Sequence, residues 1–205
     1  LTRENVRTGV ASPDRDKLSP SVSVSYKLLE DKEFRIRAFY KNIYRLPTFN
    51  DLYYQEMGNK NLRPEDANQF NVGFTYLETE IPFLSEFVFS IDGYYNRVTD
   101  KIIAIPRDMF HWSMTNKGRV NIKGMDVNLK MNIKVGKSDL VKTKANYSLQ
   151  SAKDATVGSD NFGEQIPYTP VHSGSGSISY EHGKWEAGYN MVFSGVRWIG
   201  QMTDR

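Results

Sequence analysis

The side chains best suited to bind a ligand are aromatic and polar groups in three long polar stretches, residues 45–65, 100–118 and 151–170. Aromatic rings provide a large contact area at a low cost in side-chain entropy, and their polar tips can orient a ligand. Stretches of about twenty residues without regular structure are uncommon in compact domains and are often functional. The candidate ligand contacts are Tyr53, Tyr54, Met57, Asn59, His111 and Trp112.

Motifs for catalysis and for metal binding are missing from the sequence. The chain of 205 residues has no cysteine, and its three histidines, His111, His172 and His182, are not spaced as metal ligands. It also lacks nucleophile, phosphate-loop and paired-carboxylate motifs. We therefore expect no enzymatic activity, no catalytic residue, no bound metal and no cofactor.

Charge and hydropathy exclude two further classes of protein. The chain has 27 basic and 24 acidic residues, and the basic residues are scattered rather than clustered with aromatics, so we expect no nucleic-acid partner. Its apolar runs are too short for a membrane helix. A membrane β-barrel stays possible, because barrel strands alternate and keep the mean hydropathy low.

Apolar and polar residues alternate with a period of two, which predicts an all-β fold of about eight strands. In the clearest case, Val141, Thr143 and Ala145 alternate with Lys142 and Lys144. The predicted strands are residues 21–28, 34–41, 70–76, 87–96, 120–135, 141–150, 173–180 and 185–194.

Short and long connections alternate along the chain. Short turns are predicted at residues 29–32, 77–86, 136–139 and 181–184, and the three long polar stretches separate the other strands. An antiparallel up-and-down meander joined in this way has its short turns on one rim and its long loops on the other, as in outer-membrane barrels. We expect Asp31, Lys137 and Gly183 on the first rim, and Asn59, Phe110 and Asp160 on the second.

The alternation also predicts which side of the sheet each residue faces. Val141, Thr143, Ala145 and Tyr147 are expected to face outward, and Lys142, Lys144 and Asn146 to face the lumen. Val120 and Ile122 have the opposite parity to Val127, which predicts a β-bulge near Gly124.

Two bands of aromatic residues favour a membrane barrel over a soluble β-sandwich, whose core also alternates. The bands are on the order of 20 Å apart along the membrane normal, close to the height of the apolar belt of a barrel. The band near the short turns is Tyr26, Phe34, Tyr76, Phe87, Tyr180 and Trp185. The band toward the long loops is Tyr40, Phe70, Tyr95, Tyr147 and Phe193.

Four segments resemble motifs of the TonB-dependent outer-membrane receptors. They are "YRLPTFNDLY" (44–53), "GNKNLRPE" (58–65), "NKGRVNIKGMDV" (116–127) and "IPYTPVHSGSGSISY" (166–180). The resemblance extends over residues 18–193, corresponds to the C-terminal part of the receptor barrel and has a Bacteroidetes-like character.

The resemblance implies a part of a transmembrane barrel of about 22 strands, with the plug domain absent from this chain. Residues 1–205 would form one partial barrel domain in the outer membrane of a Gram-negative bacterium, with residues 45–65, 100–118 and 151–170 as extracellular loops. The implied partners are outer-membrane lipid, TonB acting through the plug, and a scarce nutrient such as a ferric siderophore or cobalamin.

Structural explanations of the same motif residues, and two rival folds, stay open. Gly58 and Asn59 favour a turn with positive φ, and Glu65 is suited to accept bonds from loop backbone. The rivals are a soluble β-sandwich that binds glycans and a small complete eight-stranded barrel, in which the first and last strands would pair. A barrel fragment alone would have two open edges, so the isolated fragment is expected to associate edge to edge.

Overall fold

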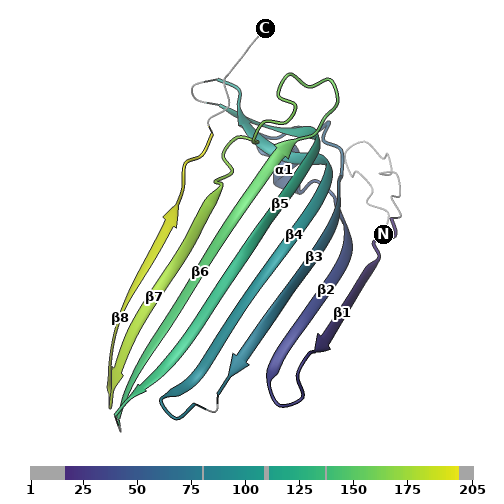
Figure 1. Ribbon diagram of the computed structural model, residues 1–205. Coiled ribbons are helices and arrows are strands. Elements are labelled where there is room, and N and C mark those ends of the chain that lie inside the picture. Colours follow the sequence, from purple (N-terminus) through teal and green to yellow (C-terminus); the bar gives the residue numbers. More distant parts are fainter. Residues whose placement is uncertain (1–16, 80, 109–110, 137, 199–205) are drawn as a thin grey trace.

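The chain forms one eight-stranded antiparallel sheet in the computed structural model, which describes residues 17–79, 81–108, 111–136 and 138–198. Each strand pairs with its neighbours in sequence, in the order β1-β2-β3-β4-β5-β6-β7-β8 (Figure 1). The elements are β1 (Ser21–Lys27), β2 (Glu33–Arg45), α1 (Phe49–Tyr53), β3 (Glu65–Glu78), β4 (Leu84–Pro106), β5 (Trp112–Val135), β6 (Asp139–Asp154), β7 (His172–His182) and β8 (Trp185–Ser194). Within the described residues, no helix is both long and apolar enough to cross a membrane.

This topology confirms the up-and-down meander. The turns that join β1 to β2 and β7 to β8 lie at the lower end in Figure 1, and the connections after β2 and β6 lie at the upper end. The rims predicted for Asp31, Gly183, Asn59 and Asp160 are therefore confirmed, whereas Lys137 and Phe110 lie outside the described residues.

Both rival folds are wrong for the described part of the chain. The strands form one sheet and not the two packed sheets of a sandwich. β1 and β8 are the two edges of that sheet and do not pair, so the chain does not close as a small barrel. The edges expose backbone groups that can pair with further strands.

The second long polar stretch is not a loop, and this prediction is wrong. β4 and β5 stay paired from Thr99 opposite Arg119 as far as Pro106 opposite Trp112, so residues 107–111 alone connect the two strands. Pairing satisfies the backbone of this ribbon, and Ile102 is buried within it. The third connection is also shorter than predicted, because β6 continues to Asp154 and leaves residues 155–171.

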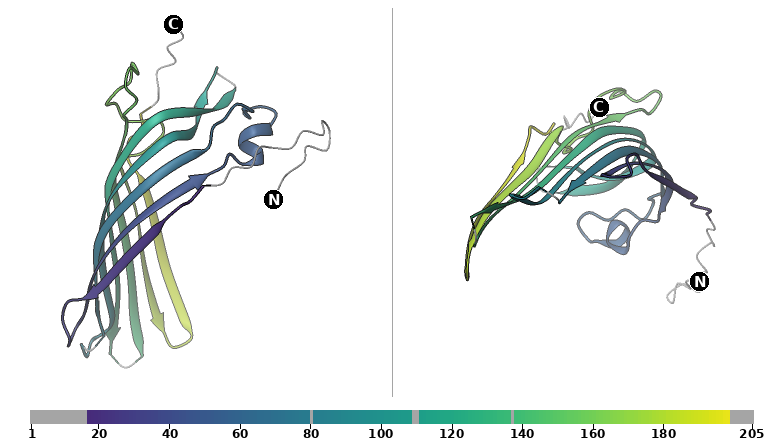
Figure 2. Two further views of the ribbon diagram at one scale, coloured as in Figure 1. Left: turned by 90° about the vertical axis from the view of Figure 1, so that its right-hand side faces the viewer. Right: turned by 60° about the horizontal axis from the view of Figure 1, so that its bottom comes forward.

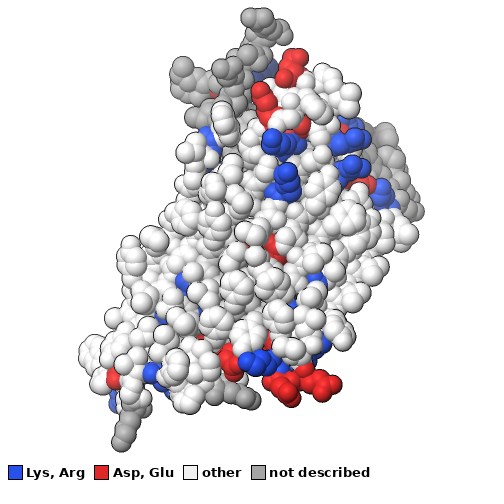
Figure 3. Space-filling model, viewed as in Figure 1, with Lys and Arg blue, Asp and Glu red and all other residues white. Residues whose placement is uncertain are grey.

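The sheet is arched, and α1 lies inside its hollow (Figure 2). The face turned away from α1 shows few charged side chains over its middle (Figure 3), as expected for a surface in contact with lipid. The hollow face is polar: the guanidinium of Arg37 lies 2.6 Å from the carboxylate of Asp92, and Lys142 pairs with Glu181. The pairing of β6 with both neighbours has no register shift, which confirms the faces predicted for this strand.

Part of each predicted aromatic band forms a contiguous group. In the upper band, Tyr40, Phe70 and Tyr95 lie opposite one another on three adjacent strands, and the rings of Tyr40 and Phe70 are 5.0 Å apart. In the lower band, the ring of Tyr76 is 6.2 Å from that of Phe34 and 6.1 Å from that of Phe87.

The predicted bulge near Gly124 is wrong. The register of β5 is continuous on both sides through this residue, and the irregularity of the β4–β5 pair lies between Leu84 and Glu86. Val120 and Ile122 differ in parity from Val127 because they face the hollow, where they are buried with other apolar residues. This upper cluster consists of Ala67, Val98, Val120, Ile122, Ala152 and Ile166.

Gly124 lies where the apolar residues of β5 change from the hollow face to the outer face. A Cβ atom on Gly124 would come within 2.4 Å of the Tyr94 hydroxyl and 2.5 Å of the Leu149 carbonyl oxygen. Tyr94 packs against the upper cluster, so its ring covers the hollow-facing side of Gly124. No residue with a side chain fits at position 124 without a shift of its neighbours.

Candidate functional site

The connection between β2 and β3 is held in shape by its own polar side chains. Thr48 caps α1 by accepting a bond from the Asp51 amide, and the Asp51 carboxylate accepts a bond of 2.9 Å from the Thr48 amide. This reciprocal pair is a capping box, which satisfies amides at the start of a helix. Arg45 at the end of β2 donates to Asp51 at 2.8 Å and so fastens the helix to the wall.

The second half of this connection is clamped to the β4–β5 ribbon. The Asn59 side chain donates to the Met114 carbonyl at 2.9 Å, and the Met114 amide donates to the Met57 carbonyl at 2.9 Å. The predicted turn with positive φ at Gly58 and Asn59 is wrong, because neither residue has positive φ. Glycine is needed at position 58 because a Cβ atom there would lie 2.7 Å from the Tyr54 nitrogen.

Glu65 anchors the same connection from the start of β3. Its carboxylate accepts a bond of 3.1 Å from the Ile102 amide and lies 3.5 Å from Arg45 and 3.8 Å from Lys101. The expected bond to backbone is confirmed, although Ile102 belongs to a strand rather than to a loop. Together these contacts make the β2–β3 connection and the ribbon one supported unit.

The connection between β6 and β7 is organised around a buried carboxylate at the end of β6. Asp154 accepts bonds from the Thr156 amide at 2.8 Å and the Ser159 hydroxyl at 2.7 Å, and lies 2.9 Å from the Lys117 ammonium. Burial alone raises the pKa of Asp154, but these three partners outweigh burial and lower the pKa from 3.8 to about 2. Asp154 is therefore ionised at neutral pH.

These supports create a pocket of about 440 Å³ between the β2–β3 connection and the tip of the ribbon. Three of the predicted contacts, Met57, His111 and Trp112, line it together. The lining also includes residues that the sequence analysis did not single out: Gln55, Glu56, Gly58, Arg107, Asp108 and Ser113. The sequence could have indicated these residues only by their position, because each lies within four residues of a predicted contact.

The other predicted contacts lie outside this pocket. Tyr53 is half exposed on α1, where its ring lies 5.0 Å from that of Phe49 and 5.8 Å from the Lys60 ammonium. Tyr54 is also exposed and does not line the pocket. Asn59 lies beside the pocket, where both ends of its amide are occupied by the protein.

Two of the pocket residues are partly committed to contacts within the protein. The Trp112 ring lies 5.0 Å from that of Tyr168 in the β6–β7 connection. His111 is half exposed, and its Nδ1 atom lies 2.8 Å from the Asp108 carboxylate. The described residues contain no group of three or more His, Cys, Asp or Glu side chains that could hold a metal ion. The pocket presents aromatic, charged and amide side chains.

Comparisons with known proteins agree with this architecture. The family model for "TonB dependent receptor-like, beta-barrel" matches residues 2–205. The chain is similar to the vitamin B12 transporter BtuB of Photobacterium profundum, with 22% identity over 168 residues, or 80% of this chain and 25% of that protein. It is also similar to the vitamin B12 transporter BtuB of Vibrio vulnificus, with 32% identity over 85 residues, or 41% of this chain and 13% of that protein.

Among solved structures, the copper transporter OprC aligns with a TM-score of 0.60 over 83% of this chain and 25% of its own, at 19% identity. At that identity the likeness concerns the fold alone. The chain spans about a quarter of the length of OprC and of the first BtuB relative.

The chain belongs to the TonB-dependent receptor β-barrel family, as its sequence motifs indicated. It is thus part of an outer-membrane protein of a Gram-negative bacterium, in a family of receptors and transporters and not of enzymes. The Bacteroidetes-like character stays a prediction.

Proposed function

We propose that this segment supplies wall and ligand-binding rim to a TonB-dependent importer, and that the imported nutrient is of the cobalamin class. The observation that carries the proposal is the pocket in which Met57 meets His111 and Trp112. Two relatives named as vitamin B12 transporters favour cobalamin over a ferric siderophore. A volume of about 440 Å³ suits one edge of a large, ring-rich ligand.

In this proposal the rim that carries α1 faces the outside of the cell. The β2–β3 connection, the tip of the β4–β5 ribbon and residues 155–171 then form part of the extracellular surface. Ligand captured there would pass through the lumen when TonB acts on the plug domain. The polar hollow face, with pairs such as Arg37 and Asp92, is the wall along which this passage would run.

The test is cyanocobalamin binding and uptake by the full-length protein carrying His111→Ala or Trp112→Phe. The second substitution keeps an aromatic ring against Tyr168 while it removes the indole from the pocket. A ring that stacks on ligand contributes roughly 1–3 kcal/mol by analogy with base stacking, so we expect affinity to fall about 5- to 150-fold in His111→Ala, which removes the ring. Trp112→Phe keeps a smaller ring and should weaken binding less.

Phe162→Ala is the matched control, because Phe162 is an exposed aromatic residue on the same rim that does not line the pocket. Its affinity should equal that of the wild type. If the pocket variants bind normally at normal surface levels, the pocket is not the ligand site. If the pocket variants bind a ferric siderophore or copper more weakly but bind cobalamin normally, the import role stands and the nutrient is reassigned.

A further inference from the structure

Four basic side chains stand at outward positions within and just above the upper aromatic row. The register places Lys123 opposite Tyr95, within that row, and Asn121 one outward position higher. Facing strands are about 5 Å apart and outward positions recur about every 7 Å, so these cations form one compact patch on β4, β5 and β6. The patch consists of Arg97, Arg119, Lys123 and Lys153.

No ion pair within the described part of the chain neutralises the positive charge of this patch. All four side chains are exposed, and the ion pairs found among the described residues involve none of them. Asp66 lies at a neighbouring outward position, but it already pairs with Lys17 and accepts a hydrogen bond from the Asn42 side chain. Figure 3 shows basic side chains gathered near the upper end of the outer face.

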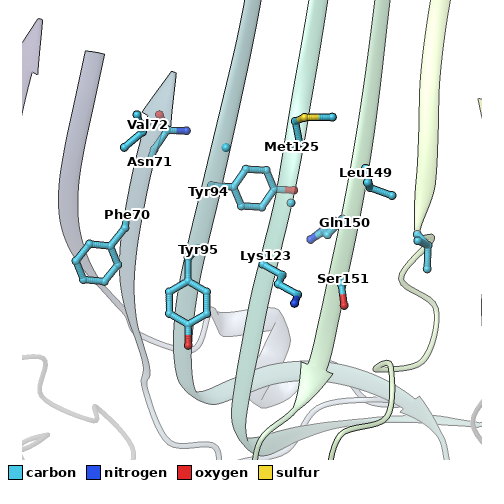
Figure 4. A pocket seen from close by; sticks show the side chains of 13 residues that line it. Phe70, Asn71, Val72, Tyr94, Tyr95, Lys123, Met125, Leu149, Gln150 and Ser151 are labelled. Carbon is cyan, nitrogen blue, oxygen red and sulfur yellow. The ribbon is translucent and has the colours of Figure 1, made fainter. Parts of the chain in front are cut away.

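An apolar groove of about 650 Å³ lies directly below the patch. Its outward-facing lining comes from Phe70, Val72, Tyr95, Met125 and Leu149, and Lys123 stands at its border toward the rim that carries α1, which is at the bottom of Figure 4. Gly93 leaves its floor open, since a Cβ atom there would have its nearest neighbour at 3.8 Å. On each of the four strands that form the groove, two outward positions and the residue between them contribute to its lining, which places the groove on the outer face.

We propose that the patch and the groove together bind a phosphorylated, acylated glycolipid of the outer leaflet. An acyl chain would fill the groove, and phosphates of the headgroup would pair with the four cations. Charge complementarity is the reason for this choice, because four unpaired cations at the aromatic boundary of the membrane match a headgroup with more than one phosphate. The assignment to the outer leaflet rests on the orientation proposed above.

The first test measures binding of bisphosphorylated lipid A, and of its dephosphorylated form, to the purified full-length protein. Lys123→Gln/Lys153→Gln removes two charges from the patch. Lys144→Gln/Lys184→Gln, at a hollow-facing position and in the β7–β8 turn, is the matched control. Each cation near an anionic surface contributes a factor of about five, so the patch variant should bind bisphosphorylated lipid A about 30-fold more weakly and the control should bind normally.

The second test fills the groove. Gly93→Leu should weaken binding of lipid A with its full set of acyl chains, whereas Gly176→Leu should not. Both glycines face outward, and an added Cβ atom would have its nearest neighbour at 3.8 Å and 3.9 Å respectively, so the two substitutions are sterically matched.

Three results would overturn the proposal: equal binding by patch and control variants, equal binding of dephosphorylated lipid, or tighter binding of phosphatidylglycerol. Cyanocobalamin binding by the same variants separates the two proposals. It should stay normal, because neither the patch nor the groove shares a residue with the rim pocket.

Discussion

The lower wall and the upper rim use the same strands with opposite patterns. In the lower wall of β5, Val127 and Leu129 face outward while Asn128 and Lys130 face the hollow. In the upper rim, Val120 and Ile122 face the hollow while Arg119 and Lys123 face outward. The exchange takes place across Gly124 without any change of register.

The difference shows that the surroundings of a strand, and not the strand itself, decide which face is apolar. Inside the membrane the outward face meets lipid and the hollow face meets water or polar groups. Above the membrane the outward face meets headgroups and water, and the hollow face is covered by packed connections that contribute Ile166. A single rigid sheet can therefore hold a soluble-type core on top of a membrane wall.

The largest expected effect comes from a charge placed in the upper cluster. Val120 is fully buried and lies opposite Asp154, so Val120→Asp would bury an unpaired carboxylate beside another one. We expect a loss of about 4 kcal/mol in the free energy of unfolding, measured by urea denaturation of the full-length protein in micelles. Thr99→Asp puts the same group on the exposed outward face opposite Arg119 and should be nearly neutral. Equal losses in both variants would contradict the exchange of faces.

A smaller effect is expected from a charge on the lipid face of the lower wall. Val127→Lys should lower the free energy of unfolding, measured in lipid vesicles, by roughly 2–4 kcal/mol, because lysine is unfavourable on the outward face near the middle of a bilayer. Asn128→Lys, one residue further along and exposed toward the hollow, should change stability by no more than about 0.5 kcal/mol. If the adjacent positions respond alike, the assignment of faces in the wall is incorrect.

Much of the wall could be predicted from sequence because a lipid-facing strand follows a local rule. The eight strands, their order and the faces of Lys142 and Lys144 all follow from alternation with a period of two. The rim could not be predicted in this way. The exchanged pattern at Val120 was interpreted as a bulge, because a register shift and a change of surroundings produce the same alternation in sequence.

The candidate site was predictable in part for a related reason. Met57, His111 and Trp112 meet because neighbouring connections on one rim must lie close together. Tyr53 and Tyr54 were misplaced because α1 turns them away, although Thr48 and Asp51 already had the spacing of a capping box. The ribbon after Asp100 was missed because the residues that clamp it, Asn59 and Glu65, lie in another part of the sequence, and alternation does not reveal such contacts.

The smallest expected effect concerns the carboxylate that closes the upper rim, and it depends on pH. The pKa of Asp154 is about 2 in the folded protein, below its ordinary value of 3.8, so the ionised form stabilises the fold. This contribution is fully present above about pH 4 and is lost as the pH falls toward 2. A shift of that size corresponds to about 2 kcal/mol.

Hydrogen exchange of residues 155–171 should therefore accelerate between pH 4 and 2 more than exchange in β6. Asp154→Asn should open the connection already at pH 7 and flatten its acid dependence, whereas Asp160→Asn, exposed in the same connection, should behave as wild type. An unchanged acid profile in Asp154→Asn would show that Lys117, Thr156 and Ser159 hold the rim without its charge.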